Sequence, residues 1–207
     1  MKNEKQEKPP FVQREKFYPK LIVGIGGSAG ALDAYKMLLR AIPPDIGMAF
    51  VIISHMSPTT HSLLAEILSR HTKMPVNVAS MTMPILTNNV YIIPPDSDLS
   101  IENYTFKITS PRSDRGKQID IFFTSLAQAM GVRAIGIVLS GFYNDGTEGC
   151  KQIKAHGGKT FAQDFSAEVD SMPLSVQVAG YADFVMPLSR IPDKLKSIAK
   201  ALINQYG

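Results

Sequence analysis

Short apolar runs alternate along the chain with stretches in which apolar residues recur every three or four positions. Uninterrupted apolar runs are typical of strands buried on both faces, and the wider spacing is typical of amphipathic helices. The first pair sets the pattern, because the run Leu21–Val23 precedes apolar residues at helical spacing between Leu32 and Ile42. Further strong runs lie at 48–53 and 135–139. The alternation predicts an α/β fold: a doubly wound, mostly parallel sheet with helices on both faces.

Residues 72–109 depart from this alternation. Short runs of alternating polarity are separated there by Pro75, by Asn88-Asn89 and by Pro94-Pro95, which are hairpin and loop signals. We expect one more parallel strand in this stretch, followed by a small antiparallel hairpin excursion. Helical spacing then resumes from Ile119.

The first 18 residues differ from the rest of the chain. They mix both charge signs, include Pro9-Pro10 and show no sustained period. We therefore expect a flexible charged tail at 1–18 and a single domain at 19–207, a length sufficient for a substantial core.

Composition narrows the classes of partner and cofactor. The net charge is only +4 and the basic residues are scattered, so the chain lacks the clustered basic face of a nucleic-acid-binding protein. Cys150 is the single cysteine, which excludes an internal disulfide and a cysteine-based zinc site. No apolar run approaches the length of a membrane span. We expect a cytoplasmic protein with no nucleic-acid partner and no direct membrane insertion.

The glycine-rich turn after the first apolar run supports three interpretations. Residues 26–30 spell G-x-S-x-G, a nucleophile elbow that presents Ser28 at a helix N-terminus. Gly24, Gly26 and Gly30 also form a variant of the dinucleotide-binding fingerprint. Alternatively, the glycines only let a helix pack closely on the strand, and Ser28 caps that helix.

The end of the second apolar run separates these interpretations. A dinucleotide site usually has an acidic residue here, but the run ends in Ser54-His55 and no acid lies between Gly47 and Leu64. A histidine at this place is what a serine nucleophile needs as its base. The serine interpretation is therefore favoured over the nucleotide-binding one.

Two acidic residues compete to be the third member of such a site. Asp145 and Asp164, like Ser28 and His55, each follow the carboxyl end of a predicted strand, so all four should lie along one edge of the sheet. In a triad, Ser Oγ is expected near His Nε2 and the carboxylate near Nδ1–H. Asp145 is favoured because it lies in a glycine-rich loop, where it could also cap the following helix. Four other acids are expected to be solvated: Asp96, Asp98, Asp114 and Asp120.

Four separated motifs together resemble a known family. The turn at 26–31 is similar to G-x-S-x-G-G, and 55–58 is similar to an H-M-P segment. Residues 139–146 resemble L-T-G-M-G-x-D-G, and 162–164 with Met172-Pro173 resemble A-Q-D…M-P. These motifs occur in this order in the catalytic domain of the CheB family of chemotaxis receptor methylesterases. The resemblance runs from about Lys20 to about Leu202.

The resemblance implies both a reaction and a set of site residues. Ser28 would be the nucleophile, His55 the general base and acid, and Asp145 the residue that orients the imidazole. Ala29 and Phe142 would lie at the oxyanion and substrate position. The substrate would be a glutamate γ-methyl ester on the cytoplasmic helices of a chemoreceptor, and some members also deamidate glutamine. No metal or organic cofactor is implied.

The chain departs from the family pattern at several positions, since Ala31 replaces the second glycine of the turn and Ala29 a frequent threonine. Two larger departures bear on function. Phe142-Tyr143 replaces Met-Gly beside the expected nucleophile, which is expected to alter the path of the loop or narrow the ester pocket. About twenty residues before the first strand leave no room for a receiver domain, so a separate signalling protein is the expected regulator. The alternative functions are a non-catalytic or altered-substrate signalling module of the same fold and, less favoured, a nucleotide-binding domain.

Overall fold

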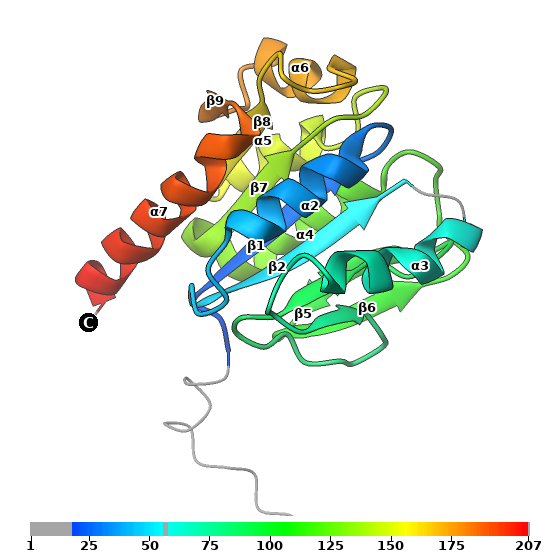
Figure 1. Cartoon of the computed structure of the whole chain (residues 1–207), viewed down its shortest axis with the longest axis horizontal. Coiled ribbons are helices and arrows are strands. Elements are labelled where there is room, and N and C mark those ends of the chain that lie inside the picture. The colour runs from blue at the N-terminus through cyan, green and yellow to red at the C-terminus, as the bar shows by residue number, and fades with distance from the viewer. Residues whose placement is uncertain (1–17, 56–57, 207) are drawn as a thin grey trace, which may run out of the picture.

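The sheet is the centre of the fold, and all of its strands run parallel. The computed structural model describes residues 18–55 and 58–206. Nearly all of the expected tail at 1–18 lies outside these residues. Within them, the main sheet has seven strands in the order β3-β4-β2-β1-β7-β8-β9 (Figure 1). Its strands are β1 (Leu21–Gly27), β2 (Met48–Ser54), β3 (Val76–Val78), β4 (Val90–Ile92), β7 (Ala134–Val138), β8 (Lys159–Gln163) and β9 (Phe184–Met186).

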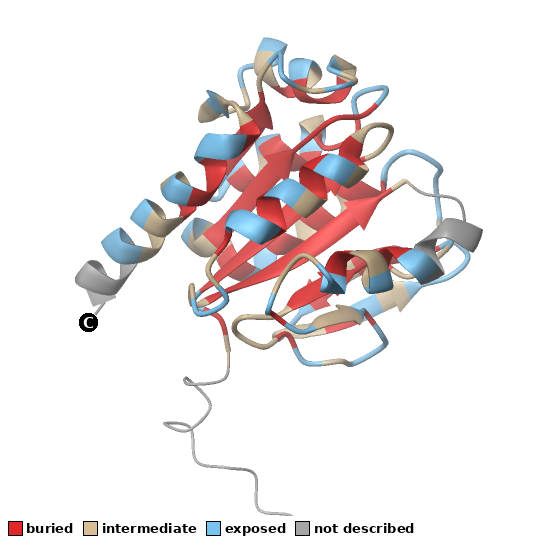
Figure 2. Cartoon of the chain, in the orientation of Figure 1, coloured by how far each residue is buried: buried red, intermediate tan, exposed pale blue. Residues whose placement is uncertain are grey.

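Helices cover both faces of this sheet, as the alternating pattern predicts. One core joins the sheet to α2, α3 and α7, and a second core joins its other face to α4, α5 and α6. The central strands lie buried between these layers (Figure 2). The doubly wound α/β architecture is therefore confirmed. The helices are α2 (Ala31–Ala41), α3 (Pro58–Ser69), α4 (Gln118–Met130), α5 (Thr147–Ala155), α6 (Ser171–Val178) and α7 (Ile191–Tyr206), with short 3₁₀ turns at Gly131–Arg133 and Leu188–Arg190.

The middle of the chain differs in one detail from the sequence prediction. Both β3 and β4 join the parallel sheet, where one strand was expected. Each has only three residues, too few for the apolar pattern to distinguish a sheet strand from a loop. The antiparallel excursion follows as expected, formed by β5 (Asp98–Glu102) and β6 (Thr105–Thr109).

Glycines let α4 approach the sheet more closely than any side chain would allow. Gly24 of β1 lies opposite Gly136 of β7, and the ring of Phe123 packs over both. A Cβ atom at Gly24 would lie 2.7 Å from Phe123 Cε1, and one at Gly26 would lie 2.6 Å from Ile119 Cγ2. The packing role considered for this glycine-rich segment is therefore present. It places the first turn of α4 next to the carboxyl ends of β1 and β7.

The candidate residues meet where the order of the strands reverses. The chain passes from β1 to β2 on one side and later returns to β7 on the other side of β1. Gly27 pairs with Ser54 and Gly26 with Val138, so the residues that follow these strands leave the sheet at one edge. Such a switch point, at the carboxyl ends of parallel strands, is where open α/β sheets bind ligands.

The close packing of α4 on β1 predicts the effect of Gly24→Ala. The added methyl group would overlap the ring of Phe123, and overpacking of this kind costs about 1–3 kcal/mol. Thermal unfolding should therefore occur several degrees lower. The double variant Gly24→Ala/Phe123→Leu tests the cause, since the smaller side chain leaves space for the methyl group. Strictly additive losses in the double variant would contradict this account.

Candidate active site

Ser28 lies at the turn between β1 and α2, and its backbone is held by the neighbouring loop. Its N–H donates to the carbonyl of Ser140 at 2.9 Å, and its own carbonyl accepts from Ala31 N–H at 3.1 Å. The helix cap is Gly30, with φ 72°, and no side chain caps the helix. The interpretation of Ser28 as the cap is therefore wrong. The half-buried Ser28 side chain remains available at the carboxyl edge of the sheet.

Two backbone amides beside Ser28 are without an acceptor in the described part of the chain. The β7–α5 loop passes so close that a Cβ atom at Gly141 would lie 3.1 Å from Ser28 Cβ. The N–H of Gly141 is occupied by the carbonyl of Val169 at 2.9 Å. The N–H groups of Ala29 and Phe142 have no acceptor among the residues that the structure describes. An oxyanion hole requires free amides beside a nucleophile, so Ala29 and Phe142 remain the candidates for that role.

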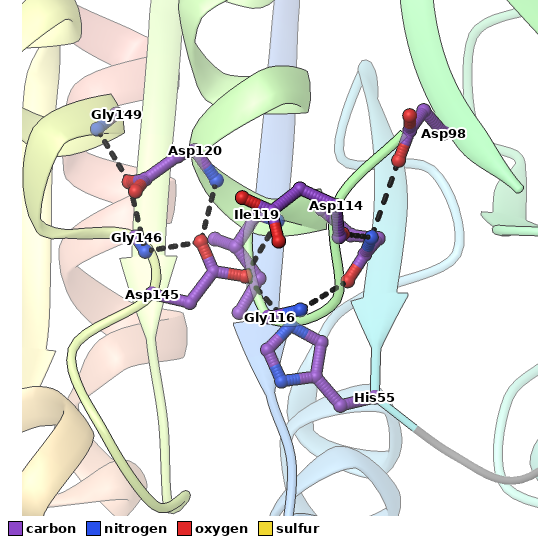
Figure 3. A network of polar contacts seen from close by, with 10 residues as sticks. His55, Asp98, Asp114, Gly116, Ile119, Asp120, Asp145, Gly146 and Gly149 are labelled. Atoms are coloured by element: carbon purple, nitrogen blue, oxygen red, sulfur yellow. Dashed lines mark hydrogen bonds and ion pairs between the residues drawn. The ribbon is translucent and has the colours of Figure 1, made fainter. Parts of the chain in front are cut away.

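His55 follows β2 and contacts the carboxylate of Asp145. The two side chains meet at 2.6 Å between Nε2 and Oδ2 (Figure 3). The expected ring orientation, with the carboxylate on Nδ1, is therefore wrong. With Nε2–H directed at Asp145, Nδ1 is the nitrogen left to accept a proton. No hydrogen bond joins Ser28 Oγ to His55 among the described residues, and such contacts often tighten only when substrate binds.

Asp145 is buried, with 2% of its surface exposed, and its carboxylate is saturated with hydrogen bonds. Besides His55, Oδ2 accepts from the backbone N–H of Ile119 at 3.0 Å, and Oδ1 accepts from Asp120 N–H and Gly146 N–H, each at 2.9 Å. Ile119 and Asp120 belong to the first turn of α4. Asp145 thus caps α4, whereas the sequence suggested a cap on its own helix α5. The positive end of α4 stabilises a negative charge here.

Asp164, the other acid considered, takes part in a different interaction. Its Oδ1 accepts from the N–H of Ser166 at 3.0 Å and stabilises a local turn after β8. The preceding residue, Gln163, accepts from Ser140 N–H at 3.2 Å. The structure therefore brings Asp145, and not Asp164, to His55.

Asp98, expected to be solvated, is buried and helps to fix the start of α4. Only 6% of its surface is exposed. Its carboxylate accepts from Ser113 N–H at 2.7 Å and from Gln118 Nε2 at 3.2 Å. Gln118 also donates to the carbonyl of Asp114 and accepts from the N–H of Gly116, two residues that lie between Asp98 and Asp145 in Figure 3. The expectation failed because β5, where Asp98 lies, packs against α4 rather than facing water.

Asp120 was also expected to be solvated, and it is half-buried beside Asp145. Its Oδ1 accepts from the N–H groups of Gly146 at 2.9 Å and Gly149 at 2.8 Å, at the start of α5. Burial, together with the neighbouring charge of Asp145, raises the pKa of Asp120 to about 6. One signal could have found it: an acid in the first turn of a helix that follows a loop.

The departure at Phe142-Tyr143 leaves the backbone in a glycine-like conformation. Tyr143 has φ 67°, a region that glycine adopts without cost. Its side chain is 82% exposed, and that of Phe142 is 54% exposed. Glycine at this position of the family motif therefore has a steric reason. The tyrosine is accommodated by turning its ring toward solvent.

The single cysteine of the chain takes no part in this arrangement. Cys150 is buried on α5, and burial raises the pKa of its thiol, so the thiolate form is disfavoured. Among residues 18–55 and 58–206, no three His, Cys, Asp or Glu side chains are grouped so as to hold a metal ion.

Comparisons with known proteins identify the family. Residues 23–195 match the family model of CheB methylesterase. The chain belongs to this family. The crystal structure of the Thermotoga maritima CheB methylesterase catalytic domain matches with a TM-score of 0.79 and 30% identity, over 86% of this chain and 98% of that one. The resemblance seen in the motifs is therefore confirmed.

Curated relatives carry a two-part name. A protein-glutamate methylesterase/protein-glutamine glutaminase of Hydrogenovibrio crunogenus is 33% identical over 86% of this chain and 49% of its own length. A putative enzyme of the same name from Leptospira interrogans is 29% identical over 85% of this chain and 92% of its own length. The chain thus spans about half the length of some relatives and nearly all of another.

The strained conformation of Tyr143 predicts that Tyr143→Gly stabilises the protein. A left-handed residue with a Cβ atom costs roughly 1–2 kcal/mol, of which the greater freedom of glycine in the unfolded chain cancels a part. We expect a net gain of up to about 1 kcal/mol in the free energy of unfolding, measured by urea denaturation. Tyr143→Phe is the matched control and should leave stability unchanged. Loss of stability in the glycine variant would contradict the assignment of strain.

The raised pKa of Asp120 predicts a pH-dependent effect of Asp120→Asn. The folded protein holds the Asp120 proton up to about pH 6, whereas the unfolded chain releases it near 3.8, so Asp120 destabilises the fold increasingly as pH rises through this window. At pH 8 the variant should melt roughly 2–4 °C above wild type, which is the shift expected for about 1 kcal/mol in a domain of this size. Near pH 4.5 its melting temperature should rise little. Asp45→Asn, at an exposed loop, should be neutral at both pH values.

Proposed function

We propose that this chain is a serine carboxyl-ester hydrolase that removes methyl groups from glutamate γ-methyl esters on the cytoplasmic helices of chemoreceptors. Glutamine deamidation at the same sites would use the same chemistry. The observation that supports this best is the 2.6 Å contact between His55 and the buried Asp145, at the edge of the sheet where Ser28 emerges. Family membership and the names of the relatives point to the same reaction.

In the proposed reaction, His55 acts through Nδ1 as the base. It takes the proton from Ser28 Oγ while the oxygen attacks the ester carbonyl, forming a tetrahedral intermediate. His55 then returns that proton to the departing methoxide as methanol leaves and the acyl-enzyme forms. Water, deprotonated by His55, attacks the acyl-enzyme, and Ser28 leaves with the proton, which releases the glutamate side chain. The N–H groups of Ala29 and Phe142 stabilise the oxyanion in both steps.

Asp145 stabilises the imidazolium that forms at each proton transfer. Its carboxylate is itself held by backbone N–H groups of Ile119, Asp120 and Gly146, so no reorganisation is needed when the charge appears on His55. The same contact fixes the tautomer, because Nε2–H donates to the carboxylate and Nδ1 keeps its lone pair.

The proposed substrate also implies where the enzyme acts and what regulates it. We infer that 19–207 is the catalytic domain, that it acts in the cytoplasm on receptor helices, and that a separate signalling protein regulates it. In the described part of the chain, no helix is both long and apolar enough to cross a membrane.

The nucleophile is tested by methanol release from a methylated receptor cytoplasmic fragment. Wild type should release methanol, and Ser28→Ala should lose on the order of a million-fold in rate, as dissected triads do. Residual turnover above roughly a thousandth of wild type would mean that Ser28 is not the nucleophile. Circular dichroism of both proteins checks that the fold is retained.

A matched pair of variants tests which carboxylate is the third member of the proposed triad. Asp145→Asn should lose about ten-thousand-fold in rate because it favours the wrong tautomer of His55. Asp164→Asn, whose carboxylate accepts from Ser166 in a local turn, should keep most of the activity. The reverse result would overturn the assignment of Asp145. If no ester turns over and a fluorophosphonate fails to label Ser28, the non-catalytic module is the better interpretation.

A further inference from the structure

Asp120 is hydrogen-bonded both to the Asp145 carboxylate, which contacts His55, and to the backbone of the next residue, Gly146. Its backbone N–H donates to Asp145 Oδ1 at 2.9 Å, and its own Oδ1 accepts from the N–H of Gly146, the next residue along the chain, at 2.9 Å (Figure 3). The N–H of Gly146 is shared, because it also contacts Asp145 Oδ1 at 2.9 Å. Two carboxylates therefore meet at one donor.

The two acids cap each other's helices. Asp145, which precedes α5, binds the first-turn N–H groups of α4, and Asp120, in the first turn of α4, binds Gly146 and Gly149 at the start of α5. This reciprocal arrangement locks the β7–α5 loop to α4 on either side of Asp145. The Asp120 side chain therefore holds the loop that carries the carboxylate in contact with His55.

We propose that Asp120 is a positioning residue of this site: it fixes Asp145 against His55 and places a second negative charge behind it. A helix cap alone does not require this arrangement, because serine, threonine or asparagine would cap α5 without a charge. A second half-buried carboxylate next to Asp145 is electrostatically unfavourable until a positive charge appears nearby. The imidazolium of His55 is that charge, so the pair stabilises the charged intermediate more than the resting state.

Few charged groups act on Asp120 among the residues that the structure describes. Asp145 faces it from the loop, Glu148 from α5, and His55 lies beyond Asp145. The Cys150 thiol also lies within its field and is neutral. Glu148 is exposed and is bound to Lys151 and Gln152, so its charge is largely compensated. Asp120 is thus the group whose charge should act on His55 through Asp145.

The test separates charge from geometry with two variants. Asp120→Asn keeps an oxygen acceptor for Gly146 and Gly149 but removes the charge, whereas Asp120→Ala removes both. Glu148→Gln, at the same end of α5, is the matched control for loss of an exposed charge. The readouts are the pKa of the His55 imidazole by NMR, and kcat, KM and the acid limb of kcat/KM with a methylated receptor fragment.

We expect Asp120→Asn to lower the His55 pKa by on the order of half a pH unit and to shift the acid limb by the same amount. Asp120→Ala should also lower kcat by about tenfold or more with little change in KM, because the interaction acts in the transition state. Glu148→Gln should change none of these. A His55 pKa in Asp120→Asn equal to that of wild type would overturn the proposal and leave Asp120 as a structural cap.

The kinetic arm rests on the proposed function, but the NMR arm does not. If wild type releases no methanol, the proposed function fails while the His55 titration still decides the role of Asp120. If Asp120→Ala does not fold, Asp120→Asn carries the test alone, since its side chain has the same shape.

Discussion

The close contact between α4 and β1 determines where the site can form. Phe123 lies over the paired glycines Gly24 and Gly136, and Ile119 lies over Gly26, so the helix packs almost directly on the backbone of the sheet. Its first turn is thereby brought to the carboxyl ends of β1 and β7. Two first-turn N–H groups then hold Asp145 in place. A sheet with larger side chains at these positions would keep the helix, and its positive end, too far away.

This packing assigns two purposes to one set of glycines. In the nucleophile-elbow interpretation they serve the turn at Ser28, and in the packing interpretation they serve the helix. Gly30, with its positive φ, allows the turn at Ser28. Gly24 and Gly26 allow the side chains of α4 to pack on the backbone of the sheet. The interpretations treated as rivals in the sequence are therefore compatible, apart from the assignment of the helix cap to Ser28. Gly24 and Gly26 are not free to change, because a Cβ atom at either would overlap side chains of α4.

The sequence predicted the architecture well because burial leaves a strong pattern. Apolar runs of five or more residues, such as 48–53 and 135–139, are typical of interior strands of such a sheet, and each lies largely within one. The three-residue strands β3 and β4 were ambiguous because a run that short has no readable period. The carboxylates were harder still. Asp98 and Asp120 look like surface acids in the sequence, and only the packing of β5 and α5 against α4 buries them.

The orientation of the His55 ring could not have been read from residue types, since it depends on which direction the carboxylate approaches. Asp145 is held by α4, on the face of the sheet opposite α2, and the imidazole reaches it through Nε2. Ser28 belongs to the turn that begins α2. In the proposed reaction, the imidazole therefore has to connect groups that are fixed by helices on opposite faces of the sheet. That requirement makes the position of Asp145, and of whatever holds Asp145, more critical than the choice of nitrogen, because a small movement of α4 would break the contact whichever nitrogen made it.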